Sequence, residues 1–260
     1  MKARILFVII FAMLSTAAFS QNTRLSDYNS IGWYNHFLNL KLSAKFGLHA
    51  EYQWRRSNLI TDWQQSLLRV GVNYNLNARV LFRVGYAWIE TYPYGVYSIN
   101  GLGRDFTEHR IYEMLQFTHK EGILDFSHRL MLEQRFVGRY SSASLTKEDE
   151  YPLLHRVRYM MRVQIPLKGK EIKDKTPYLA FYDEVFIGFG KNVNASIFDQ
   201  NRFGALIGYR FTKYIRLEAG FMNQIAQLGR QVNKQSIFQY NNGLIVNTYF
   251  NIDVSKKTKQ

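Results

Sequence analysis

LLRVGVNYNL, residues 67–76, and VLFRVGYAW, residues 80–88, are two neighbouring stretches in which apolar side chains alternate with polar or small ones. The apolar set of the first stretch is Leu68, Val70, Val72, Tyr74 and Leu76, and Arg69 and Asn73 lie between its members. Successive side chains of a β-strand point to opposite faces of a sheet, so this alternation predicts two strands, each with one apolar face. Only residues 77–79 separate the stretches, which indicates a short turn between them.

The same period of two recurs along most of the chain. It is clear in residues 48–55, 124–136, 153–165, 203–211, 215–225 and 238–252, and less regular in 31–42, 109–118 and 178–189. Eleven strands are visible in this way, whereas single-chain bacterial membrane barrels have an even number. We therefore expect either a twelfth strand from residues 21–29 or one stretch divided wrongly. Glu113 and Asp183 lie on apolar faces, which indicates a register shift or a membrane boundary at these two positions.

The connections between the stretches fall into two classes. Short ones occur near residues 44–46, 77–78, 120–122 and 212–213, and long ones at 56–66, 92–106, 139–151, 191–197 and 229–235. Short connections follow alternate strands, so the two classes should lie on opposite rims, as in bacterial outer-membrane barrels. The charged connection 168–176 is the exception, because it is long but lies on the short-turn side.

Three features favour a membrane barrel over a soluble one, in which the apolar faces would pack together inside. The strands are long, roughly 10 to 15 residues, where soluble strands have a mode near 5–6. Arg and Glu occupy the centres of the polar faces, which suits a crowded lumen with bidentate ion pairs. Tyr and Trp gather near strand ends, as interfacial girdles require. The predicted fold is an all-β, transmembrane, antiparallel up-and-down barrel of about 10–12 strands; a soluble periplasmic β-protein is the alternative.

Residues 1–20 have the pattern of a secretory signal peptide. Lys2 and Arg4 precede an apolar run from residue 5 to residue 18, and small residues Ala18 and Ser20 come before Gln21. The run is short for a spanning helix, which needs about 20 apolar residues. We expect cleavage after Ser20, and a barrel formed by residues 21–260 in the outer membrane of a Gram-negative bacterium. Outer-membrane lipid and the barrel-insertion machinery are the expected partners.

Composition and motifs argue against several other functions. The net charge is +14, but the basic residues recur singly along strands and form no nucleic-acid motif, so we expect no nucleic-acid partner. The chain has no cysteine, which excludes disulfides and thiolate metal sites. No known catalytic or nucleotide fingerprint occurs, and the adjacent Ser127 and His128 must point to opposite faces of one strand. We expect no catalytic residues, no metal and no cofactor; the acidic residues 148–150 indicate a solvated loop.

Several short motifs, taken in order, resemble a known family. They are Trp33 with KFGLHAEY (45–52), HRLMLEQR (128–135), RVRY (156–159), YDEVF (182–186) and FDQNR (198–202). This set resembles the uncharacterised outer-membrane β-barrel family called domain of unknown function 2490. The resemblance covers nearly all of the chain after residue 20. It implies a barrel in the outer membrane and carries no activity.

The candidate site is the charged inner face. Its predicted members are Glu51, Arg69, Arg83, Arg129, Glu133, Arg135, Arg156, Arg158, Arg162, Glu184, Arg202, Arg210, Arg216 and Glu218. Arg outnumbers Glu, so an open lumen would be positive and would attract anions. A fixed ion-pair network that fills a narrow barrel is the other interpretation.

Three functions are consistent with these interpretations. The first is passive passage or binding of small anionic solutes. The second is a closed structural or interaction barrel that acts through its extracellular loops, and the third is a lipid-modifying outer-membrane enzyme. The aromatic segment 92–97 is predicted to be external, where it would form part of a girdle or stack on a glycan.

Overall fold

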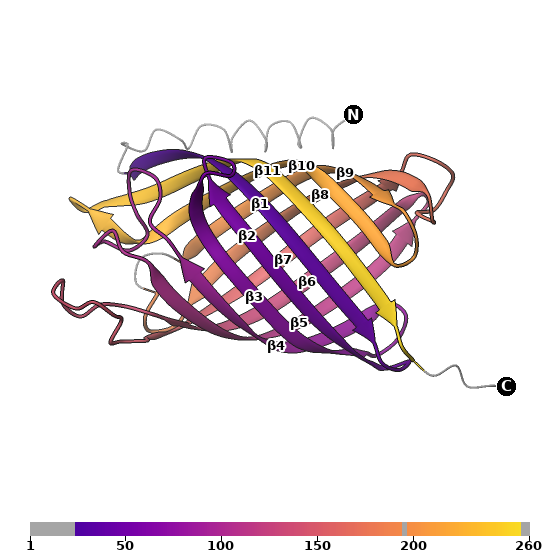
Figure 1. Ribbon diagram of the computed structural model, residues 1–260, viewed down its shortest axis with the longest axis horizontal. Helices are drawn as coiled ribbons and strands as arrows, with labels where there is room; N and C mark the ends of the chain where they lie inside the picture. The colour runs from indigo at the N-terminus through magenta and orange to yellow at the C-terminus, as the bar shows by residue number, and fades with distance from the viewer. Residues whose placement is uncertain (1–23, 194–196, 256–260) are drawn as a thin grey trace, which may run out of the picture.

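The computed structural model describes residues 24–193 and 197–255, and every regular element in these ranges is a β-strand. The strands are β1 (Arg24–Lys41), β2 (Phe46–Ser57), β3 (Asp62–Asn75), β4 (Val80–Thr91), β5 (Phe106–Glu121), β6 (Leu124–Val137), β7 (Leu153–Pro166), β8 (Thr176–Phe189), β9 (Phe198–Arg210), β10 (Ile215–Val232) and β11 (Gln235–Asp253). They form one closed barrel (Figure 1), in which each strand pairs with its neighbours in sequence. Each of the eleven stretches identified by alternation corresponds to one strand, so the prediction of an all-β barrel is confirmed.

The barrel closes through a parallel pair. β1 and β11 run in the same direction, in register from Arg24 opposite Ser236 to Lys41 opposite Asp253 (Figure 1). All other neighbouring strands are antiparallel. With an odd number of alternating strands the first and last must point the same way, so parallel pairing is the only means of closing the sheet. Both expected explanations of the odd count are therefore wrong within the described residues: residues 24–29 begin β1, and no stretch was divided wrongly.

The connections lie on two rims, as their parity predicts. Residues 42–45, 76–79, 122–123, 167–175 and 211–214 connect strands at one end, which we call the short-turn rim. Residues 92–105, 138–152, 190–193 and 197 lie at the other end, the long-loop rim, where β1 begins. Two predicted long connections are wrong: β2 and β3 are joined by residues 58–61 only, and β10 and β11 by residues 233–234. Their turn residues Asn58, Leu59, Asn233 and Lys234 have positive φ, the conformation of tight hairpin turns.

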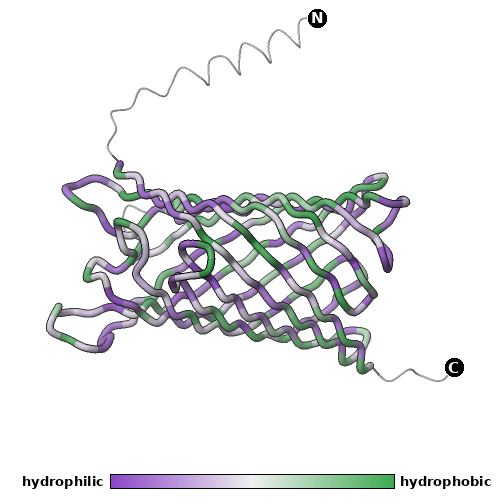
Figure 2. The backbone as a smooth tube through the Cα atoms, turned by 45° about the horizontal axis from the view of Figure 1, so that its top comes forward, coloured by the Kyte–Doolittle hydropathy of each residue, from purple (hydrophilic) through white to green (hydrophobic). Residues whose placement is uncertain are grey.

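The apolar faces form the outer wall of the barrel and the polar faces form the lumen. Along the strands, green and purple alternate in Figure 2. Outward-facing Val84 and Ile207 are 57% and 58% exposed, whereas inward-facing Glu51 and Glu133 are 4% and 0% exposed. The predicted orientation, with aliphatic side chains outside and guanidinium groups inside, is confirmed. The described residues contain no helix that is long and apolar enough to cross a membrane.

Glu113 and Asp183 are carboxylates on the outer wall. The strand register is continuous through both positions, so a register shift does not explain them. The amide of Gln134 donates to Glu113 at 3.1 Å, and the amide of Asn201 donates to both oxygens of Asp183 at 3.0 and 3.1 Å. Each carboxylate is thus bonded to an outward-facing amide on the next strand.

Two β-bulges turn extra side chains inward. Near residue 55 of β2 the register shifts, and Gln64 of β3 becomes the extra residue. Near residue 186 of β8 a second shift leaves Asp199 of β9 as the extra residue. A bulge changes the face to which a side chain points. By strict alternation Gln64 and Asp199 would face outward, but both border a cavity inside the barrel.

The predicted signal peptide, residues 1–20, lies outside the described residues.

Candidate functional site in the barrel lumen

Each of the four predicted lumen carboxylates is buried and pairs with at least one arginine. Glu51 accepts from Arg69 at 2.8 Å, and Glu184 accepts from Arg129 at 2.9 Å and from Arg158 at 2.8 Å. Arg162 donates to Glu218. Tyr178, Tyr249 and Asn247 also donate to this carboxylate, at 2.7, 3.0 and 3.2 Å. Charge-assisted bonds of this kind fix side-chain geometry inside a barrel.

Glu133 is at the centre of the densest ion-pair network. It accepts from Arg156 at 2.8 Å and from Arg158 at 2.7 Å, and Arg110 lies 3.7 Å away. Arg156 also pairs with Asp199. This network occupies the wall made by β5, β6, β7 and β8 together with the bulge in β9. It therefore covers one side of the lumen and does not fill it.

The structure places the other predicted residues in four situations. Arg135 joins the network by donating to Glu108 at 2.6 Å. Arg83 and Arg202 line the cavities, where they donate to the amide oxygens of Asn73 and Gln200, at 2.6 and 3.0 Å. Arg216 stacks on Tyr249 with its guanidinium carbon 4.0 Å from the ring centroid. Arg210 does not join the set, because it pairs with Asp174 at the short-turn rim.

Sequence reasoning missed several members of the lumen. They are Trp33, Arg55, Gln64, Glu108, Arg110 and Asp199. Glu108 and Arg110 alternate with outward residues of β5, a period that a longer reading of that strand would have detected. Gln64 and Asp199 follow from bulges, which interrupt the period and leave no signal in a pattern of alternation.

Two cavities occupy the interior. The larger, of about 1090 Å³, extends towards the short-turn rim, and twelve Lys or Arg but only four Asp or Glu residues line it. The smaller, of about 550 Å³, lies towards the long-loop rim, and seven Arg and two acidic residues line it. Both cavities therefore have strongly basic walls. Several buried donors on the wall of the larger cavity have no partner among the described residues, including Nε of Arg69 and Nε of Arg129.

Three residues border both cavities, and we call them the septum: Trp33, Arg55 and Arg202. The guanidinium carbon of Arg55 lies 3.7 Å from the centroid of the Trp33 ring, and that of Arg202 lies 4.7 Å from it. Indole Nε1 of Trp33 donates to Gln64 at 2.6 Å, so the bulge in β3 holds the ring in place.

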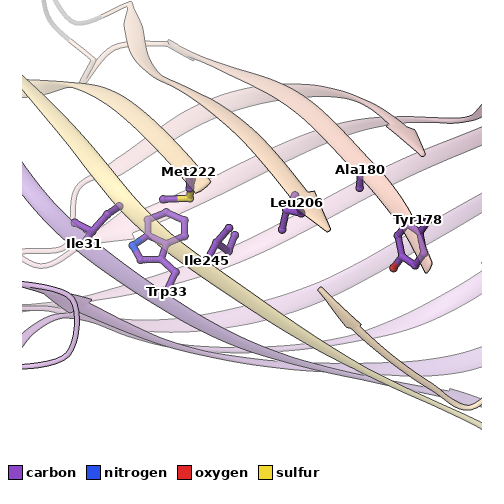
Figure 3. Packing of buried hydrophobic residues seen from close by; sticks show 7 residues of the cluster. All are labelled: Ile31, Trp33, Tyr178, Ala180, Leu206, Met222 and Ile245. Carbon is purple, nitrogen blue, oxygen red and sulfur yellow. The ribbon is translucent and has the colours of Figure 1, made fainter. Parts of the chain in front are cut away.

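The indole of Trp33 also packs into an apolar cluster on the inner wall. The cluster consists of Ile31, Trp33, Tyr178, Ala180, Leu206, Met222 and Ile245, from β1, β8, β9, β10 and β11 (Figure 3). Met222 and Ile245 lie beside the ring in this view. The septum is therefore anchored on both sides, by a hydrogen bond and by packing.

The connection between β4 and β5 folds into the barrel mouth, and the prediction that its aromatic segment is external is wrong for Tyr94. This side chain is 9% exposed, and its hydroxyl donates to Gln239 at 2.8 Å. The backbone N–H of Tyr97 donates to Asp27 at 3.1 Å. Burial raises the pKa of Tyr94, which keeps its hydroxyl protonated as a donor. Gly95 has φ +73°, and a Cβ there would lie 2.4 Å from the Asp27 carboxylate, so the inward fold requires glycine.

Ser127 and His128 lie on opposite faces of β6. Ser127 borders the larger cavity, whereas the ring of His128 stacks on His119 and meets the hydroxyl of Tyr159 at 2.8 Å. Within residues 24–193 and 197–255, no three His, Cys, Asp or Glu side chains gather to hold a metal ion.

Two of the acidic residues 148–150 accept hydrogen bonds from backbone N–H groups, one in their own loop and one at the start of β5. Asp149 accepts from the backbone N–H of Ser141 at 2.9 Å, and the bonds from Ser141 lower the pKa of this carboxyl. Glu148 accepts from the backbone N–H of Thr107 at 2.6 Å. These two carboxylates therefore fasten the β6–β7 loop.

The fold and the lumen define a class of protein, namely a closed β-barrel with an apolar outer wall and a basic, partly filled interior. The chain belongs to the family described as protein of unknown function DUF2490, whose model matches residues 31–235. Among solved structures, the chain is similar to the NanC porin, with 14% identity and a TM-score of 0.46, over 85% of this chain and 97% of the porin chain. No curated protein matches the sequence.

Proposed function

We propose that the chain is a porin-like outer-membrane β-barrel of a Gram-negative bacterium that lets small anionic solutes enter and cross its lumen by diffusion. The observation that carries this proposal is the basic excess on the walls of both cavities. Buried or half-buried guanidinium groups that exceed the available carboxylates create a positive potential, because the low-dielectric walls screen them weakly. Such a potential concentrates anions and repels cations at the mouth of the lumen.

The outer wall supports the membrane location. Large apolar side chains on all sides of the barrel are exposed, including Leu68, Val72, Phe82, Phe203 and Phe250. In water a continuous surface of this kind would promote aggregation, whereas hydrocarbon chains of lipid cover it without cost. Lipid of the outer membrane and the machinery that inserts barrels are thus the partners that the proposal requires. It requires no catalytic step and no cofactor.

A closed barrel that acts through its loops is the second candidate. Two observations favour it: the septum lies between the cavities, and the β4–β5 connection folds into the smaller cavity. In that case the arginines would serve to stabilise the inner wall.

Single-channel recording in planar bilayers separates the two candidates. We expect steady current steps, and a reversal potential in a KCl gradient that shows preference for chloride. Arg83→Gln should reduce this preference, because Arg83 faces the larger cavity without a carboxylate partner. Lys147→Gln is the control, since Lys147 is exposed on the β6–β7 loop and borders neither cavity. Protein that inserts but carries no current would establish the closed barrel, and cation preference would contradict the proposal.

A further inference from the structure

We infer that the septum is a binding site for a small, doubly charged oxyanion, such as an organic phosphate or a dicarboxylate. This inference rests on the proposed function in one respect, because the solute must reach the septum through the lumen. It goes further by assigning the site to Arg55, Arg202 and Trp33 and by naming the charge of the ligand.

The first argument is electrostatic. Arg55 and Arg202 are 4% and 9% exposed, and neither forms an ion pair with a carboxylate of the described residues. Their direct partners are the neutral amide oxygens of Gln53, Gln65 and Gln200. Every other arginine of the inner wall with comparable burial has a carboxylate partner in Glu51, Glu108, Glu133 or Glu184. A buried charge without a counter-charge is costly, so a bound anion would stabilise both groups.

The second argument is the distance between the two charges. Because both guanidinium carbons lie near one ring centroid, at 3.7 and 4.7 Å, they are closer together than the sum of those distances. They come from β2 and β9, strands that do not neighbour one another in the barrel. Two planar guanidinium groups from opposite walls of the lumen can each hold one end of a doubly charged oxyanion, since guanidinium binds carboxylate and phosphate in a bidentate manner.

The third argument is the way in which the site is held. The bulge next to Arg55 releases Gln64 to fix the Trp33 indole, and Trp33 in turn offers its ring to both guanidinium groups. Phe186 supports Arg202 from β8, with 4.6 Å between the guanidinium carbon and the ring centroid. Cation–π contacts orient an arginine through the face of its guanidinium and use none of its N–H donors. The hydrogen bond of Arg202 to Gln200 uses only Nε. Because these three residues border both cavities, a solute in either cavity can reach the site.

Trp33 provides a direct optical probe. A variant with Trp54, Trp63 and Trp88 replaced by Phe keeps Trp33 as its sole tryptophan, because the chain has 4. Detergent-solubilised protein is titrated with inorganic phosphate or succinate at constant ionic strength. We expect a saturable change in Trp33 fluorescence, with acetate and chloride binding at least about tenfold more weakly.

The arginine variants then assign the site. Arg55→Gln and Arg202→Gln should each weaken phosphate binding by at least about tenfold and leave the barrel folded, because each removes an unneutralised charge. Arg24→Gln should leave it unchanged, since Arg24 is exposed at the start of β1. Arg202→Lys keeps the charge but loses the planar fork, so its affinity should fall between those of the wild type and Arg202→Gln.

The possible failures are distinguishable. A channel that conducts chloride while Trp33 gives no saturable response to phosphate or succinate would overturn the septum site and leave the proposed function standing. Undiminished phosphate binding by the Arg55→Gln/Arg202→Gln double variant would also overturn it. Saturable binding at Trp33 in a barrel that carries no current would support the site and reject diffusion across the lumen.

Discussion

Glu133 shows how one side chain organises the inner wall at the scale of a residue. It is fully buried, and three guanidinium groups, from Arg110, Arg156 and Arg158, lie within 3.7 Å of its carboxylate. The carboxylate neutralises part of their charge and accepts their hydrogen bonds. Without it, the three arginines would repel one another inside a region from which water is largely excluded.

Glu133→Gln should therefore destabilise the barrel. Arg156 keeps Asp199 and Arg158 keeps Glu184, so we expect a loss of about 3 kcal/mol in the free energy of unfolding, near the lower end for a broken buried pair. Urea denaturation of the protein refolded in lipid vesicles measures this quantity.

Glu171→Gln is the matched control for that measurement. Glu171 pairs with Lys173 at 3.3 Å and with Lys120 at 3.7 Å, but it lies on the short-turn rim and is half-exposed to solvent. Exposed pairs contribute little, so no measurable change is expected. Equal effects of the two substitutions would show that the Glu133 network does not stabilise the barrel.

At the scale of elements, the seam between β1 and β11 determines whether the barrel is closed. Matching polar side chains bridge this seam on its inner face. The amide of Asn35 donates to Asn247 at 2.8 Å, and the amide of Asn39 donates to Asn251 at 3.0 Å. At the short-turn rim Lys41 pairs with Asp253 at 3.1 Å. These bridges fix the register of a parallel pair that no hairpin turn could set.

A cysteine cross-link tests this register directly, because the chain has no cysteine of its own. Asn39→Cys combined with Asn251→Cys should form a disulfide under mild oxidation, since the two positions are opposite one another. Non-reducing gel electrophoresis detects the product as a shift in mobility.

The control pair is Asn39→Cys with Asn247→Cys. Asn247 is opposite Asn35, which precedes Asn39 by four residues on β1, or about 13 Å, and this distance exceeds the span of a disulfide. Cross-linking of the control pair in place of the first would refute the observed register.

Alternation predicts faces well and interruptions poorly. Leu68, Val70 and Val72 were assigned to the outer wall and Arg69 to the lumen from the period of two, because that period is a property of the extended backbone itself. Gln64 and Asp199 could not be assigned, since a bulge depends on the pairing of two strands and neither strand alone specifies it. The hydrogen bond from Trp33 to Gln64 therefore depends on how β2 and β3 pair, and neither strand's sequence pattern specifies it.

At the scale of the whole molecule, closure and lumen content were the features that the sequence left open. The number of visible strands was correct, but the expected even count assumed a fully antiparallel seam. The sequence also does not decide between an ion-pair network that fills the lumen and an open lumen. Arg158 and Arg202 look alike in sequence, but Arg158 pairs with two carboxylates, whereas Arg202 donates to the amide of Gln200. Side-chain partners across the lumen come from distant strands, and local patterning does not specify them.

The environment of the outer wall is the remaining whole-molecule question, and Ile207→Arg addresses it. Ile207 is 58% exposed on β9, and its neighbours across the sheet, Leu179 and Ala219, are also apolar. If lipid covers the wall, this substitution should lower the free energy of unfolding in vesicles by about 1–3 kcal/mol, because a guanidinium must then enter hydrocarbon between the midplane and the interface, three residues from the end of β9. Ile60→Arg is the matched control: Ile60 is 54% exposed but lies in the β2–β3 turn, outside the strands, where a charge stays hydrated. Equally small effects at both positions would mean that water, and not lipid, surrounds the barrel.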